Sequence, residues 1–302
     1  MKFKHLFLYA IYGFMAFIVF FIVLFPKQKA ANIISDRLNS RLQGTRIDIK
    51  AVELLFPIGL KAINTSVILN GGNNKIEMES IFIYPEILSL YKDEKKLDID
   101  AKGYGGKIDG EVKFALQKIE KSEKYNTSLN LNFSNLEIKN LKQAVQNIDI
   151  LASFIMNGSI NYKTDVQNSF GSGNGVVELD QCRLTSENII LKQMGIEELN
   201  FTKVDIEWSK EQNILSVANL NAQGNDIKIR LNGNINLKTT KEMSQLDLKG
   251  EFEPNSARIT SLVAGLTSGG GIKSLGKLLY GSKKNGIPFK ITGTMQNPKI
   301  SI

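Results

Sequence analysis

The stretch DIKIRLNGNINL, residues 226–237, alternates apolar and polar positions over most of its length. Ile227, Ile229, Leu231 and Ile235 fall on one face of an extended chain, and mainly charged and amide residues fall on the other. A period of two is typical of a β-strand with one wet face and one apolar face. Such strands belong to antiparallel sheets, because strands of parallel sheets are buried on both faces and read as continuous apolar runs.

The same alternation recurs along most of the chain after residue 45. It is found in TRIDIK (45–50), KIEM (75–78), LDIDA (97–101), SLNLNF (128–133), VDIEW (204–208) and QLDLKGEF (245–252). We therefore predict a mainly β protein in which residues 46–302 form a long, strongly curved antiparallel sheet. From the pattern alone, the sheet is either a tightly curved barrel or sandwich core, or an open groove with an apolar concave side.

Two segments predict short helical insertions in this sheet, near residues 139–153 and 258–281. In the first, Leu141, Val145 and Ile148 recur at helical spacing. In the second, two short apolar runs at helical spacing flank three consecutive glycines, residues 269–271. Glycine is conformationally permissive, so this second segment is also the candidate for a mobile flap.

A weak internal repeat of the form apolar–x–Gly–x–apolar marks five of the strands. Each glycine has the same parity as its apolar neighbours, which predicts that the five glycines lie on the apolar face: Gly110, Gly158, Gly233, Gly250 and Gly293. A missing side chain lets the sheet bend there or lets another group approach closely. The candidate groove residues that follow are Ile108, Gly110, Val112, Phe114, Met156, Ile160, Leu231, Ile235, Leu248, Phe252 and Ile291.

The N-terminus carries a long apolar segment. Residues 6–25, from Leu6 to Phe25, contain no charged residue. As a helix, this stretch would be roughly 30 Å long, which matches the core of a bilayer. We interpret residues 1–26 as a short tail and a single transmembrane anchor. The alternative, a cleaved signal peptide, fits less well because its apolar region would be shorter, at ~7–15 residues.

Residues 27–45 follow the anchor and predict a juxtamembrane amphipathic helix, since Ile34, Leu38 and Leu42 recur at helical spacing. Lysine and arginine flank both ends of the apolar segment, so charge bias alone does not orient the chain across a membrane. The net charge is +8, but the lysines are spread along the chain and do not form an aromatic-rich basic patch. The sequence therefore gives no indication of a nucleic-acid partner, whereas anionic lipid head groups are a secondary candidate partner.

The composition argues against most enzyme chemistries. There is one Cys, Cys182, and one His, His5, which lies in the short N-terminal tail. This excludes a disulfide framework and multi-Cys metal sites, and it makes a Ser-His-Asp or Cys-His catalytic group improbable. Two glycine-rich motifs, GYGGKIDG (103–110) and GSGNG (171–175), resemble dinucleotide fingerprints but are predicted to be hairpin turns, because strand patterns follow them. We expect no enzyme activity, no cofactor and no metal.

The order of features resembles a known family. The apolar segment ends in Phe25-Pro26, and NIISDRLNSRL follows. Then come ELLFPIGLKAINTSVIL (53–69), PEILSLYK (85–92), AKGYGGKIDGEVKF (101–114) and the closing IPFKITGTMQNPKISI (287–302). Together these segments resemble the type II secretion system protein N (GspN) family. The strand–Gly–strand phrases and the closing motif also resemble the wider group of AsmA and TamB-like envelope proteins.

The resemblance implies a location and a class of function. It implies a bacterial inner-membrane protein with a single span and with the bulk of the chain in the periplasm. It further implies a component or accessory of a type II secretion system, whose partners are other secretion-system or outer-membrane proteins. The alternative that it implies is an AsmA-like module that holds lipid acyl chains in an apolar groove. It brings no catalytic residues with it, and this chain is too short to bridge the periplasm alone.

Overall fold

The computed structural model describes residues 2–42, 45–69, 74–119, 122–145, 148–165, 168–186, 198–255 and 286–301. These ranges contain two α-helices, α1 (Lys2–Val23) and α2 (Lys27–Arg41), followed by a sheet of fourteen strands. The strands are β1 (Thr45–Leu55), β2 (Gly59–Leu69), β3 (Asn74–Pro85), β4 (Glu94–Gly103), β5 (Gly106–Ile119), β6 (Ser122–Val145), β7 (Ile148–Asp165), β8 (Asn168–Ser186), β9 (Glu198–Glu211), β10 (Ile214–Gly224), β11 (Ile227–Asn236), β12 (Gln245–Pro254), β13 (Ile287–Thr294) and β14 (Pro298–Ser301). Two short 3-10 helices, η2 (Ile87–Tyr91) and η3 (Lys241–Met243), lie between strands.

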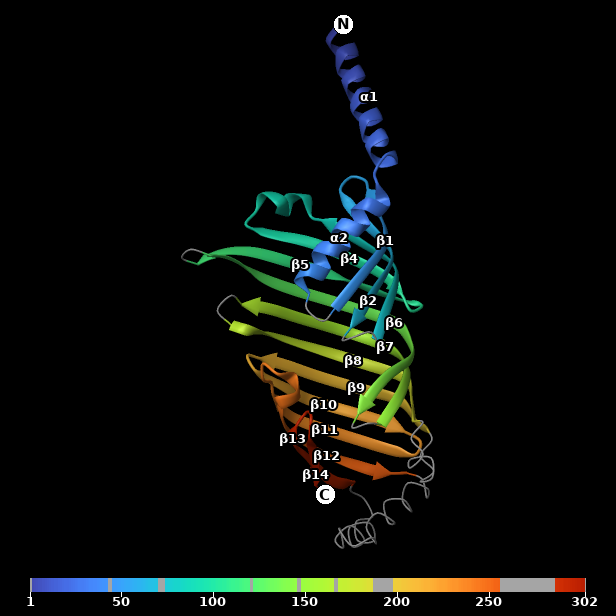
Figure 1. The fold of residues 1–302 in the computed structure, drawn as a ribbon, viewed down its shortest axis with the longest axis vertical. Coiled ribbons are helices and arrows are strands. Elements are labelled where there is room, and N and C mark those ends of the chain that lie inside the picture. Colours follow the sequence, from blue (N-terminus) through green and yellow to red (C-terminus); the bar gives the residue numbers. More distant parts are fainter. Residues whose placement is uncertain are drawn as a thin grey trace.

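The strands form one antiparallel meander in sequence order. Each strand pairs with the strands before and after it in the chain, and β1 and β14 are the two ends of the order. In Figure 1 the strands are stacked along the long axis of the molecule, from β1 near α1 to β14 near the C-terminus. The predicted antiparallel β architecture is therefore confirmed, and the sheet is not closed into a barrel.

The helix predicted near residues 139–153 is wrong. The segment forms the end of β6 and the start of β7, with Leu141 opposite Ala152 and Val145 opposite Ile148. The run of apolar residues at helical spacing covers only a few turns. The β-branched residues Val145, Ile148 and Ile150 favour a strand once a partner strand is available. The second predicted insertion, 258–281, lies outside the described residues.

The two glycine-rich motifs have different structures. Residues 103–106 form the predicted hairpin turn between β4 and β5, where Tyr104 and Gly105 have φ values of 54° and 70°. The GSGNG segment was also predicted to be a turn, but it lies inside β8. Its glycines are opposite bulky residues of neighbouring strands, with Gly173 opposite Tyr162 and Gly175 opposite Trp208. Glycines occur at these two positions because a side chain there would collide with Tyr162 or Trp208 of a neighbouring strand.

The N-terminal part of the chain is helical, as predicted. Helix α1 covers most of the apolar segment 6–25, and α2 lies within the predicted juxtamembrane helix 27–45. In the part of the chain that the structure describes, no helix is long and apolar enough to cross a membrane.

Helix α2 covers the outer edge of β1. The side-chain amide of Asn39 donates to the Ile47 carbonyl at 2.9 Å and accepts from the Ile47 N–H at 2.6 Å. The Ser35 hydroxyl accepts from the Ile49 N–H at 3.1 Å. These bonds satisfy backbone groups that a neighbouring strand would otherwise satisfy. Because an open edge strand is a template for pairing with other chains, α2 protects this end of the sheet.

The best-packed part of the sheet lies around its middle strands. Cys182, Phe201, Val204 and Ala222 are buried together on β8, β9 and β10. Partly buried apolar side chains, Ile206 and Leu220 among them, pack around this cluster. Burial of this kind is the main favourable contribution to folding, so we expect the middle of the meander to be the most stable of its described parts.

Candidate functional site: the apolar face of the open sheet

The strand register arranges the apolar residues in continuous rows across the sheet. Directly opposite residues in an antiparallel pair point to the same side, so each row stays on one face. The central row runs Ile83, Ile99, Gly110, Leu131, Ile160, Gly175, Trp208, Val217, Gly233, Leu248, Ile291 and Ile300. It reaches from β3 to β14. We call the side of the sheet that carries this row the apolar face.

All eleven candidate groove residues lie on the apolar face. Gly110, Ile160, Leu248 and Ile291 belong to the central row. The others occupy parallel rows on either side of it: Ile108 opposite Phe133, Val112 opposite Leu97, Phe114 opposite Thr127, Met156 opposite Leu179, Leu231 opposite Gly250, Ile235 opposite Leu246, and Phe252 opposite Ile287. They do not form one compact pocket, because β5 and β13 are separated by seven strands. The candidate site is a long band.

The five repeat glycines also lie on this face, and neighbouring strands occupy the space above them. A methyl group added to Gly250 would lie 2.6 Å from Cζ of Phe289, and one added to Gly158 would lie 3.0 Å from Cε2 of Phe133. One added to Gly110 would lie 2.0 Å from the Asn130 carbonyl oxygen. The glycines therefore admit the rings and backbone of adjacent strands, so a ligand on this face would meet those neighbours before it met the glycine backbone.

Trp208 packs in the same way. The position of a Cβ on Gly175 would lie 2.7 Å from the Trp208 indole Nε1, so the ring lies over the glycine of the neighbouring strand. Trp208 is only partly buried, although it belongs to the central row. It is also the single tryptophan of the chain. It therefore serves both as a packing residue and as part of the surface of the apolar face.

Most large side chains of the apolar face are half-buried instead of fully buried. Leu131, Ile160, Leu231 and Ile291 are all of this intermediate class. Among the described residues the sheet has no second sheet packed against it, since all fourteen strands belong to one sheet. The open sheet therefore leaves a continuous apolar band only partly covered by its own side chains. Contiguous apolar surface marks binding sites more often than isolated exposed apolar residues do.

One charged side chain interrupts the apolar face near the ends of β8 and β9. Lys210 is opposite Gly173 on β8 and Leu215 on β10. Its ammonium donates to the carbonyl oxygens of Gly171 and Gln212, at 3.0 Å each, and lies 5.5 Å from the centre of the Tyr162 ring. Burial lowers the pKa of this lysine. Its contacts with backbone carbonyls account for how a cation is accommodated next to apolar side chains.

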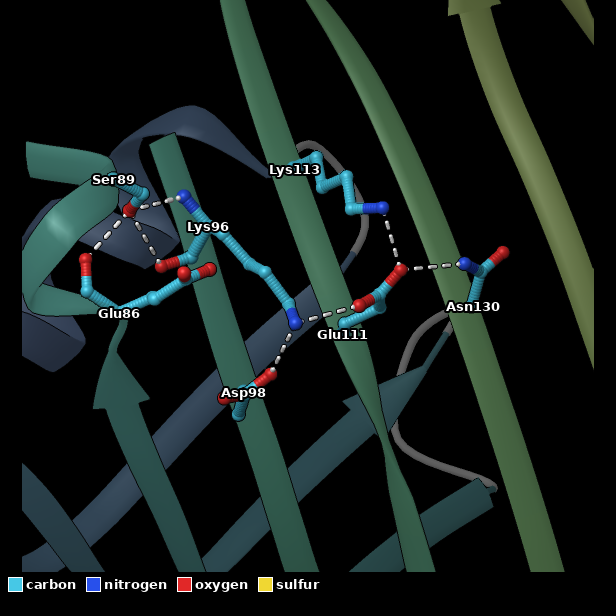
Figure 2. A network of polar contacts seen from close by, with 7 residues as sticks. All are labelled: Glu86, Ser89, Lys96, Asp98, Glu111, Lys113 and Asn130. Carbon is cyan, nitrogen blue, oxygen red and sulfur yellow. Dashed lines mark hydrogen bonds and ion pairs between the residues drawn. The ribbon is translucent and has the colours of Figure 1, made fainter. Parts of the chain in front are cut away.

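The opposite face carries networks of charges, one of which is shown in Figure 2. Glu111 on β5 accepts hydrogen bonds from Lys113 at 2.8 Å, from Lys96 of β4 at 3.0 Å and from the Asn130 amide of β6 at 3.0 Å. Lys96 also lies 3.4 Å from Asp98. The bonds from Lys113 and Lys96, in that order, lower the pKa of Glu111 from 4.5 to about 2. The network links three adjacent strands on the wet side of the sheet.

A cavity of about 600 Å³ lies at the α1 end of the sheet. The second half of α1, the turn between β1 and β2, and the ends of β3 and β4 form its walls, which include Phe17, Phe21, Phe56, Leu60, Ile83 and Leu97. Every lining residue is apolar. Ile83 belongs to the central row, and Leu97 is opposite Val112 on the apolar face.

Sequence reasoning missed this cavity. Its only signal in the chain is the turn sequence Phe56-Pro57-Ile58, where most turns of a soluble protein would carry polar residues. That this turn and α1 line the same cavity is a tertiary feature that spacing along the chain does not reveal. At the junction of the helices, Lys27 pairs with Glu53 of β1 at 2.6 Å, which holds the start of α2 against the strand that leads into the turn.

The chemistry of this face is apolar. Among the described residues, no three side chains of His, Cys, Asp or Glu converge as metal ligands. Cys182 is buried in the central cluster, and burial raises the pKa of its thiol. A thiol of this kind behaves as a small apolar side chain. What the band offers is apolar contact area.

The chain matches no protein-family model, and neither the comparison with curated proteins nor that with solved structures finds a similar protein.

Proposed function

We propose that this chain is a non-enzymatic cell-envelope protein that binds lipid acyl chains along the apolar face of its open sheet. The observation that supports this proposal is the row of directly opposed apolar residues from β3 to β14, left half-buried on a sheet that is not closed. An acyl chain covers such a band without needing any specific polar partner. Each buried methylene contributes roughly 0.8 kcal/mol, so one chain of ordinary length can be held by contact alone.

The proposal includes a membrane anchor. It rests on the uncharged sequence of residues 6–25 and on the exposed aromatic side chains of α1, such as Phe17 and Phe20. We place the anchor in the bacterial inner membrane and the sheet in the periplasm, as the resemblance to GspN and AsmA-like proteins implies. Resistance of the full chain to extraction by alkaline carbonate, together with protease sensitivity of the sheet from the periplasmic side, tests both statements.

Trp208 provides a direct test of lipid binding. It lies in the central row on β9, far along the strand order from α1. The full chain is reconstituted in nanodiscs whose lipids carry brominated acyl chains, because bromine quenches tryptophan fluorescence on contact. We expect Trp208 to be quenched relative to nanodiscs without bromine.

Two controls make this measurement specific for the apolar face. The double variant Glu207→Trp, Trp208→Phe moves the reporter one residue along β9 to the opposite face, and we expect no quenching there. Leu231→Asp should weaken quenching because it places a charge on the apolar face, whereas Asn232→Asp places the same charge on the polar face and should leave quenching unchanged. Absence of quenching in the wild-type chain contradicts lipid binding.

A second candidate function is that of a type II secretion component that docks other envelope proteins through a sheet edge. The two edges differ in a way that favours it. Helix α2 covers β1, but β14 pairs only with residues 290–293 of β13. Residues 287–289 of β13 therefore pair with β12 on one side and with no described strand on the other. Exposed edges accept added strands. A photocrosslinker at position 288 in living cells should capture a secretion-system protein, and one at Ser40 on α2 should not.

A further inference from the structure

The cavity next to α1 identifies where a ligand would reach the apolar face. Its α1 wall is open to the outside, since Phe17 and Phe21 keep 63% and 56% of their surface exposed. Its opposite wall contains Ile83 and Leu97, which are the beginning of the rows that continue across the apolar face. The cavity is therefore contiguous with two surfaces, the surroundings of α1 and the apolar band.

The lining chemistry selects one class of occupant. No lining side chain carries a charge or a hydrogen-bonding group. A peptide in this cavity would bring backbone N–H and C=O groups, and burying such groups without partners costs free energy. An aliphatic chain brings none. The volume of about 600 Å³ also accommodates a large part of a single chain.

The β1–β2 turn, which lines the cavity, and η2 both expose apolar side chains at the same end of the molecule. Phe56 and Ile58 of the β1–β2 turn are exposed, as are Leu88 and Tyr91 of η2. In Figure 1 the β1–β2 turn and η2 both lie at the end of the sheet from which α1 projects. Exposed aromatic and aliphatic side chains at loop tips are suited to the interface of a bilayer.

We infer that this cavity is the entrance through which the acyl chain of a bilayer lipid passes from the membrane around α1 onto the apolar face. The inference rests on the proposed function, because it needs both a bilayer around α1 and lipid on the sheet. The β1–β2 turn and η2 hold the entrance at the bilayer surface. From there the chain moves along Ile83 and Leu97 to Ile99 and Val112.

A matched pair of substitutions on β3 tests the entrance. Ile83→Glu places a carboxylate in the cavity, whereas Tyr84→Glu places the same group one residue away on the opposite face of the strand. Both full-length variants are reconstituted in nanodiscs of brominated lipid, and quenching of Trp208 is followed over time. We expect Ile83→Glu to slow quenching about tenfold or more, because a carboxylate in an apolar passage lacks a partner. Tyr84→Glu should match the wild type.

A neutral variant keeps the test decisive if Ile83→Glu unfolds, which circular dichroism reports. Leu60→Phe combined with Ile83→Phe fills the cavity without adding a charge and should also slow quenching. If the wild type is quenched and these cavity variants are quenched at the same rate, the entrance lies elsewhere and the proposed function stands. If Trp208 of the wild type is not quenched at all, the proposed function itself fails.

Discussion

At the scale of single residues, the polar face is held by carboxylates that share lysines across strands. Glu111 is the clearest case, because Lys113, Lys96 and Asn130 all donate to it. An ionised carboxylate with several donors is favoured over its protonated form, which explains the lowered pKa. The same contacts connect β4, β5 and β6, so the network contributes to the pairing of these strands near the cavity.

This pKa shift predicts a pH dependence with a definite sign. The pKa of Glu111 in the folded state is about 2, below its ordinary value of 4.5. Its contribution to stability is therefore complete above pH 4.5 and is lost as the pH falls from there through about 2. Because the site is partly exposed to solvent, we expect Glu111→Gln to lower the free energy of unfolding at neutral pH by only about 1 kcal/mol.

Urea unfolding of the two proteins in detergent, repeated at decreasing pH, checks this expectation. The stability difference between wild type and Glu111→Gln should shrink steadily once the pH falls below the ordinary glutamate value. Glu207→Gln, an exposed glutamate on the same face in β9, is the control. A difference that stays constant with pH would show that the lysine contacts of Glu111 do not stabilise the fold.

At the scale of elements, α2 serves as a cap for the sheet. Its side chains replace a fifteenth strand at β1, with Asn39 making the donor and acceptor contacts that a strand residue would make. The ion pair of Lys27 with Glu53 holds the other end of the helix. The helix thus ends the meander on one side and positions α1 beside the cavity.

The hydrogen bonds between Asn39 of α2 and Ile47 of β1 predict that Asn39→Ala destabilises the fold and promotes self-association. The substitution leaves the N–H and C=O of Ile47 without their partners, so we expect a loss of about 1–3 kcal/mol in the free energy of unfolding. It also opens the β1 edge, so the variant should self-associate as its concentration rises. Denaturant unfolding and sedimentation velocity in detergent measure the two effects.

Ser40→Ala is the matched control, since the Ser40 hydroxyl bonds only to the Arg37 carbonyl within α2 among the contacts that the structure describes. It should change neither stability nor association by a comparable amount. Should Asn39→Ala behave like Ser40→Ala, the hydrogen bonds to Ile47 do not protect the edge.

At the scale of the whole molecule, the fold is a chain of local contacts. Every strand contacts mainly its sequence neighbours, as in repeat proteins, so stability is expected to vary along the sheet. The buried cluster lies on β8–β10, whereas β14 is short and has exposed residues. We therefore predict that amide hydrogen exchange is slowest in β8–β10 and fastest in β14.

Hydrogen exchange with mass spectrometry on the full chain in detergent measures this gradient. Adding lipid should increase protection along the apolar rows of the middle strands if the band binds acyl chains. Uniform protection from β1 to β14 would instead indicate a single cooperative unit, and the view of a locally stabilised meander would then be wrong.

Much of the candidate site could be predicted from alternation. The eleven groove residues and five glycines were assigned to one face by parity, and the register places them there. Parity is reliable because the side-chain period of a strand is two. The error near residues 139–153 came from a different argument, the helical spacing of a few apolar residues, and the pairing of β6 with β7 determined the structure there.

The sequence by itself determined most of the strands and which of their side chains are apolar, because these properties depend on neighbours one or two residues away. The exceptions are residues 139–153 and 171–175, which are strands only because partner strands are available. Tertiary structure alone decided that the sheet stays open, that α2 caps β1 and that α1 meets the β1–β2 turn around a cavity. The sheet and the cavity join residues far apart in the chain, whereas the α2 cap joins residues 8 to 14 positions apart. The opening of the sheet depends on how strand twist and bulges accumulate over fourteen strands, which no local pattern encodes.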